Sequence, residues 1–125
     1  MEVLLLSPDL MVQSRVAAAA GRAEIPAPRI LSGSEIPAIE DTARIRLVLI
    51  DLSSPGLDVK KVVAAVRERL TGASIVAFGP HVQTAKLEAA RHAGCDRVIS
   101  RGQLDRDIQA ILEQERGPIP GDDES

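Results

Sequence analysis

Short runs of apolar residues, each only a few residues long, constrain the fold of this chain more than any other feature. The clearest covers residues 47–50, and similar runs cover residues 3–6 and 75–78. Runs of this length bounded by turn-forming residues are typical of strands that are buried on both faces, as in a parallel sheet. Two shorter stretches, residues 29–31 and 98–99, bring the predicted number of strands to five.

Segments with helical periodicity lie between these strands. The pattern is clearest after Asp58, where the apolar residues recur at intervals of three and four: Val59, Val62, Val63, Val66 and Leu70. Helices are also predicted over residues 10–22, 34–42, 83–93 and 104–114. Five strands that alternate with five helices predict an α/β domain built on a parallel sheet, with right-handed crossovers.

Length, charge and aromatic content limit the function classes. The 125 residues suffice for one domain, and Phe78 is the only aromatic residue, which excludes nucleic-acid binding by base stacking. The formal net charge is −3, and residues 117–125 hold three of the 18 acids and no base, so 15 acids and 15 bases remain. We therefore expect a neutral domain over residues 1–116, a disordered acidic tail over residues 117–125, and no nucleic-acid partner.

The small number of cysteine and histidine residues excludes disulfide-stabilised folds and Cys/His zinc sites. A single cysteine, Cys95, excludes an internal disulfide, and with only His81 and His92 it cannot complete a four-ligand Cys/His zinc site. No apolar run approaches the ~18 residues of a membrane span. The first residues also lack the basic segment of a signal peptide. We therefore expect a cytoplasmic protein that does not contact membranes.

The functional crevice of a parallel α/β sheet lies beyond the carboxyl ends of its strands. Residues that directly follow the predicted strands should therefore be neighbours in space, although they are far apart in the sequence. They are Ser7, Pro8, Asp9, Asp51, Ser53, Gly79, Pro80, His81, Ser100 and Arg101.

Two segments carry a resemblance to a known family. Residues 47–58 (LVLIDLSSPGLD) resemble the third strand and following loop of a response-regulator receiver domain, and residues 88–99 (EAARHAGCDRVI) resemble its fourth helix and fifth strand. The resemblance extends from residue 2 to about residue 114. It implies a flavodoxin-like (βα)5 fold, a doubly wound five-stranded parallel sheet with receiver topology. In that family the aspartate at the position of Asp51 accepts a phosphoryl group from a histidine kinase.

Other positions that carry chemistry in the family differ here. The acidic pair that holds Mg²⁺ in receivers falls on Ser7 and Pro8. The hydroxyl residue after the fourth strand is Gly79, the lysine after the fifth strand is Arg101, and the aromatic residue within the fifth strand is Val98. Of the residues that define a working receiver site, only the phosphoacceptor aspartate is retained.

These differences weaken a metal site. Mg²⁺ binds through carboxylate, carbonyl and water oxygens, and only Asp51, the Ser53 carbonyl and, if the loop bends, Asp9 would be available. We therefore expect no bound metal and no cofactor, with Mg²⁺ required only if Asp51 is a working phosphoacceptor. Instead we expect Arg101 to pair with the Asp51 carboxylate, directly or through one water, because a guanidinium grips a carboxylate with two parallel hydrogen bonds.

The resemblance implies a stand-alone, non-enzymatic signalling module, a pseudo-receiver within two-component signalling. Because no output domain follows the receiver-like part, we expect it to contact a protein partner such as a histidine kinase or an output protein. The family's usual partner face would comprise residues 83–93, 98–99 and 104–114. Two alternatives stay open: a functional phosphorelay component phosphorylated at Asp51, and a small flavodoxin-like enzyme or ligand-binding protein. No glycine-rich phosphate loop or nucleophile–base pair supports the second.

Overall fold

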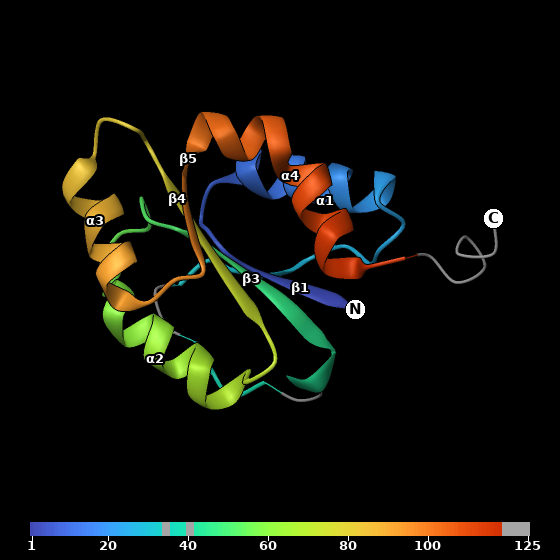
Figure 1. Cartoon of the computed structure of the whole chain (residues 1–125), viewed down its shortest axis with the longest axis horizontal. Coiled ribbons are helices and arrows are strands. Elements are labelled where there is room, and N and C mark those ends of the chain that lie inside the picture. Colours follow the sequence, from blue (N-terminus) through green and yellow to red (C-terminus); the bar gives the residue numbers. More distant parts are fainter. Residues whose placement is uncertain (34–35, 40–41, 119–125) are drawn as a thin grey trace.

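A single parallel sheet forms the centre of the computed structural model, which describes residues 1–33, 36–39 and 42–118 (Figure 1). Its strand order is β2-β1-β3-β4-β5, and every neighbouring pair is parallel. The five-stranded, doubly wound parallel sheet predicted from the sequence is confirmed. Its strands are β1 (Glu2–Leu6), β2 (Arg29–Leu31), β3 (Ile45–Asp51), β4 (Ser74–Gly79) and β5 (Arg97–Ser100).

Helices cover both faces of this sheet. The pair α1 (Leu10–Arg22) and α4 (Arg101–Arg116) packs on one face, and the pair α2 (Val59–Arg69) and α3 (Thr84–Ala93) packs on the other (Figure 1). Capping side chains determine where helices begin, because Asp9 accepts hydrogen bonds from the first amides of α1 and Asp58 accepts one from the Lys61 amide. Within the described ranges, no helix is both long enough and apolar enough to cross a lipid bilayer.

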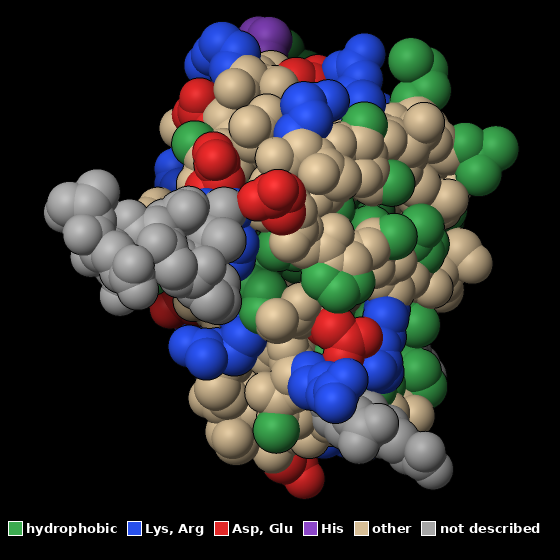
Figure 2. Space-filling model, turned by 90° about the vertical axis from the view of Figure 1, so that its right-hand side faces the viewer, with side chains coloured by type: hydrophobic (Ala, Val, Ile, Leu, Met, Phe, Trp, Pro, Cys, Tyr) green, Lys and Arg blue, Asp and Glu red, His purple; other side chains and the backbone are tan. Residues whose placement is uncertain are grey.

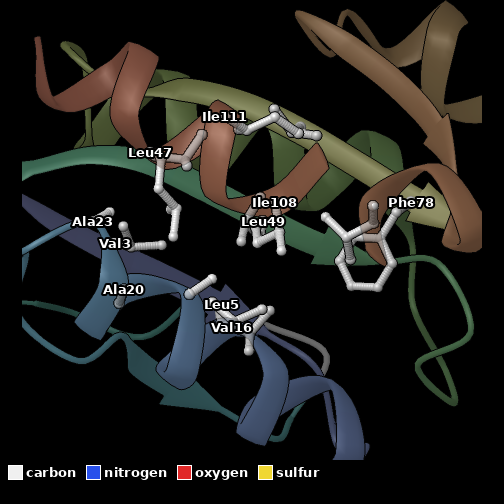
Figure 3. Packing of buried hydrophobic residues seen from close by; sticks show 14 of the residues in the cluster. Val3, Leu5, Val16, Ala20, Ala23, Leu47, Leu49, Phe78, Ile108 and Ile111 are labelled. Carbon is white, nitrogen blue, oxygen red and sulfur yellow. The ribbon is translucent and has the colours of Figure 1, made fainter. Parts of the chain in front are cut away.

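The core follows the alternation of side chains along each strand. In β1, Val3 and Leu5 pack toward α1 and α4, whereas Leu4 and Leu6 pack toward α2 and α3. Figure 3 shows the first of these layers, in which Phe78 is the largest side chain and is fully buried. Apolar layers thus pack against both faces of the sheet, and the residues that follow the strands gather at its carboxyl edge.

Two predicted segments differ from the observed structure. The helix predicted over residues 34–42 is wrong for the described residues 36–39, which have no regular structure and lead to a 3-10 turn, η1 (Thr42–Arg44). Pro37 explains this, because it lacks an N–H group and disfavours helical geometry at Ile36. The helix predicted to begin at residue 104 begins earlier, since α4 starts at Arg101 with Ser100 as its cap. The predicted tail falls largely on residues 119–125, outside the described residues.

Candidate functional site

Asp51 ends β3 at the carboxyl edge of the sheet, and its side chain is buried. Each carboxylate oxygen accepts one hydrogen bond from a neutral donor. The Ser7 hydroxyl donates to Oδ2 at 2.7 Å, and the Ser53 backbone N–H donates to Oδ1 at 2.9 Å. The Ser54 hydroxyl donates to the Asp51 backbone carbonyl at 2.7 Å, which fixes the loop that follows the strand. The carboxylate is therefore held by the protein's own hydroxyl and amide groups.

Ser7 connects the end of β1 to the ends of both neighbouring strands, β2 and β3. It follows β1, is fully buried, and its backbone N–H donates to the Leu31 carbonyl at 2.9 Å. Its hydroxyl also accepts a hydrogen bond from the Asp9 backbone N–H at 3.2 Å. A hydroxyl at this position donates to the neighbouring Asp51 carboxylate, whereas a second carboxylate here would repel it. Ser7 thus satisfies a buried acidic group without a cation.

Arg101 does not form the direct ion pair with Asp51 that the sequence suggested. Its guanidinium instead binds the Asp9 carboxylate, and both side chains are about one-third exposed. The hydrogen bond from Arg101, followed by the amides of α1, holds the pKa of Asp9 below its ordinary value against the opposing effect of desolvation. The pKa of Arg101 is raised, first by Asp9 and to a lesser extent by the charge of Asp51.

The positions of the two helix starts explain why Arg101 binds Asp9 and not Asp51. Asp9 caps α1 and so projects from the carboxyl edge of the sheet, while Arg101 lies in the first turn of α4 rather than in a loop. The two helix starts are neighbours on the same face of the sheet, which brings the guanidinium to Asp9 before it can reach the buried Asp51.

The space beside Gly79 is already occupied. A Cβ atom at this position would lie 3.3 Å from the Cβ of Leu52 and 3.8 Å from a methyl group of Leu87. Both leucines are buried. A larger residue at position 79, such as a hydroxyl residue, would therefore require Leu52 to shift.

The remaining predicted residues take different positions. Pro8 and His81 are exposed, Pro80 is partly buried, and Ser100 caps α4 by accepting a hydrogen bond from the Gln103 amide at 3.1 Å. The structure thus joins Ser7 and Ser53 to Asp51, and Asp9 to Arg101. It leaves Pro8, Pro80, His81 and Ser100 outside this network. Among the described residues, no three His, Cys, Asp or Glu side chains are arranged to hold a metal ion.

Comparisons with known proteins identify the architecture. No protein-family model matches the sequence, and no curated protein matches it. Solved structures do match, among them the receiver domain of the sensor histidine kinase PA1611 from Pseudomonas aeruginosa PAO1, with a TM-score of 0.71 at 21% identity over 94% of this chain and 98% of that one. The chain has the receiver fold. The PA1611 receiver domain has a magnesium ion coordinated in its active site cleft.

Two further structures support this assignment of the receiver fold. The receiver domain of NtrX from Brucella abortus matches with a TM-score of 0.71 at 16% identity, over 91% of this chain and 97% of that one. A response regulator receiver domain protein from Clostridium thermocellum matches with a TM-score of 0.72 at 11% identity, over 91% and 92%. The similarity covers almost the whole length of each receiver domain.

Sequence reasoning missed two contacts at the carboxyl edge of this receiver fold. It treated Ser7 only as a lost acid, although a hydroxyl beside a buried carboxylate is itself a signal for a hydrogen bond. It also overlooked Leu52, which directly follows Asp51 and covers Gly79. An apolar residue in an otherwise polar loop was the available signal, because such a residue needs a buried contact.

Cys95 lies between α3 and β5 and is partly buried in the receiver fold. Burial raises the pKa of its thiol to about 11. Because the thiolate is the reactive form, we expect alkylation near neutral pH to be roughly 100-fold slower than for a free thiol. Iodoacetamide labelling followed by intact mass measures this, with the urea-unfolded chain as the control. Equal rates in the folded and unfolded chains would contradict the expectation.

Proposed function

We propose that this chain is a non-enzymatic signalling module on the receiver fold that acts through contact with a protein partner, without Mg²⁺-dependent phosphorylation of Asp51. The observation that carries the proposal is the hydrogen bond from the Ser7 hydroxyl to the Asp51 carboxylate, at 2.7 Å between two buried side chains. It puts a neutral donor of the protein where a working receiver has a metal-binding carboxylate.

The chemistry of phosphoryl transfer supports this proposal. Transfer to a carboxylate needs an oxygen free to attack and positive charge to neutralise the transferring group. Here both Asp51 oxygens accept hydrogen bonds within the protein. The Asp9 carboxylate, the other candidate ligand at this edge of the sheet, binds Arg101 and caps α1. One available carboxylate is a poor ligand set for Mg²⁺, so the residues present do not fit this metal.

The packing around Gly79 supports the proposal that the module does not change its conformation in response to phosphorylation. Gly79, at the end of β4, has no side chain that could reach toward Asp51, and Leu52 and Leu87 pack where its Cβ atom would lie. Val98 takes the place of the aromatic residue that moves in working receivers. The partner would therefore recognise a surface that is already formed. The similar structures come from a sensor histidine kinase and from response regulators, which makes a histidine kinase or an output protein the class of partner we propose.

Incubation with Mg²⁺ and acetyl phosphate, followed by intact mass spectrometry, tests the proposal. We expect no mass gain of one phosphoryl group, because neither a metal ion nor a hydroxyl stabilises the transferring group. A competent receiver domain treated in parallel shows that the reagent is active. A phosphoryl adduct on the wild-type chain that is absent from Asp51→Asn would refute the proposal and favour the alternative, a working phosphorelay component.

A further inference from the structure

A basic cavity lies at the amino-terminal edge of the sheet, opposite the edge that carries Asp51. It has a volume of about 520 Å³, and we call it the amino-edge cavity. Figure 2 looks onto the side of the molecule where the amino end of β1 lies, and Lys and Arg side chains are prominent on it. The cavity is lined by Met1, Glu2, Pro26, Ala43, Arg44, Arg46 and Arg116.

The charges in this cavity are unbalanced. Among its described lining residues the one acid is Glu2, which already binds Arg29 through two hydrogen bonds of 2.9 and 3.2 Å. In the part of the chain that the structure describes, Arg116 donates hydrogen bonds to two backbone carbonyls, those of Gly117 and Ala23. Arg44 and Arg46 are exposed, and within residues 1–33, 36–39 and 42–118 no acceptor or carboxylate contacts their guanidinium groups. Because guanidinium groups bind carboxylates in a paired geometry, the cavity fits a ligand with several carboxylates.

The chain itself contains such a ligand. Helix α4 ends at Arg116, which lines the cavity, and Asp122, Asp123 and Glu124 follow shortly after it. Asp122 lies six positions after Arg116, and an extended chain spans at most about 3.5 Å per residue, so the acids have a reach of roughly 20 Å. These three acids lie outside the described part of the chain, so their charge and their spacing from Arg116 come from the sequence alone.

We propose that residues 122–124 bind the amino-edge cavity of their own chain through Arg44 and Arg46. The short connection from Arg116 gives the acids a high effective concentration at the cavity, so weak individual ion pairs suffice. The contact is electrostatic and is weakened by salt. It lies at the opposite edge of the sheet from Asp51 and does not depend on the function proposed for that site.

The first test compares the wild-type chain with the triple variant D122N/D123N/E124Q by NMR. We expect the backbone amide and side-chain Nε resonances of Arg44 and Arg46 to differ between the two at about 20 mM salt, and to converge at about 0.5 M salt. No difference at Arg44 and Arg46 would overturn the proposal. Differences of similar size at exposed lysines such as Lys60 and Lys86 would also overturn it, because they would indicate nonspecific attraction.

The reciprocal test changes the cavity. In R44E/R46E we expect the amide resonances of residues 122–124 to move to their high-salt positions, whereas the matched control K60E/K86E, with the same change in net charge, leaves them in place. An equal response to both variants would overturn the proposal. Shifts that grow with protein concentration would overturn it as well, since they would assign the contact to a second copy of the chain.

Discussion

Ser7→Asp is expected to destabilise the fold by about 3–5 kcal/mol in the presence of a chelator, and to regain stability when Mg²⁺ is added. The wild-type Ser7 hydroxyl donates to a buried carboxylate, and a carboxylate in its place would put two negative charges side by side without a cation. Mg²⁺ would neutralise both, since paired carboxylates are oxygen ligands that it prefers. Urea unfolding followed by circular dichroism, with and without Mg²⁺, measures the effect.

Ser7→Asn is the matched control, because it changes the polarity and size of the side chain without adding charge. We expect it to lose some stability and to show no dependence on Mg²⁺, as for the wild-type chain. If Ser7→Asp were as stable as wild type in chelator, or if wild type gained the same stability from Mg²⁺, the hydrogen bond between Ser7 and Asp51 would not be what disfavours the metal.

Phe78→Ala is expected to lower the free energy of unfolding by about 3–5 kcal/mol. The ring is fully buried between the sheet and the helices α1 and α4 (Figure 3), and truncation would leave a cavity there. The backbone carbonyl of Phe78 accepts a hydrogen bond from the Leu52 N–H at 2.8 Å, so the same strand end also supports the loop after Asp51. Circular dichroism is the appropriate probe, since the chain has no Trp or Tyr for fluorescence.

Phe78→Leu is the control for this prediction. It keeps most of the apolar volume, and we expect it to cost no more than about 1.5 kcal/mol. A loss for Phe78→Ala as small as that for Phe78→Leu would show that the layer beneath α1 and α4 can close over the missing ring. The contribution of this residue to the core would then be smaller than its burial indicates.

The strands and most helices could be predicted because buried positions are apolar and recur in the sequence with the period of the helix or strand. The helices predicted over residues 10–22 and 104–114 correspond to α1 and α4, each of which buries apolar residues at helical spacing. The start of α4 was missed because Gly102 lowers helix propensity, although a glycine in the first turn costs little when Ser100 caps the helix. The segment around Pro37 was missed for the opposite reason, since helix-forming neighbours masked the effect of the proline.

Ser7, Asp9, Asp51 and Arg101, which the structure joins by hydrogen bonds, were among the residues predicted to be neighbours, but their pairing was not predicted. Parallel topology alone gathers Ser7, Asp51 and Arg101 at one edge, because all follow strands of the same sheet. Which carboxylate Arg101 binds depends on the direction of its side chain, which follows from where α4 begins. The sequence pattern does not specify that direction, so Asp9, one residue beyond the matched positions, was not recognised as the partner.

The ion pair between Asp9 and Arg101 affects which helices unfold together in local opening events. It joins the starts of α1 and α4, and Arg15 and Asp105 form a second ion pair between the same helices. On the other face, Arg67 ties the end of α2 to the turn after α3. Exposed pairs add little energy, but they couple the elements that they join. Amide hydrogens of α1 and α4 should therefore exchange with solvent through one shared opening, and those of α2 and α3 through another.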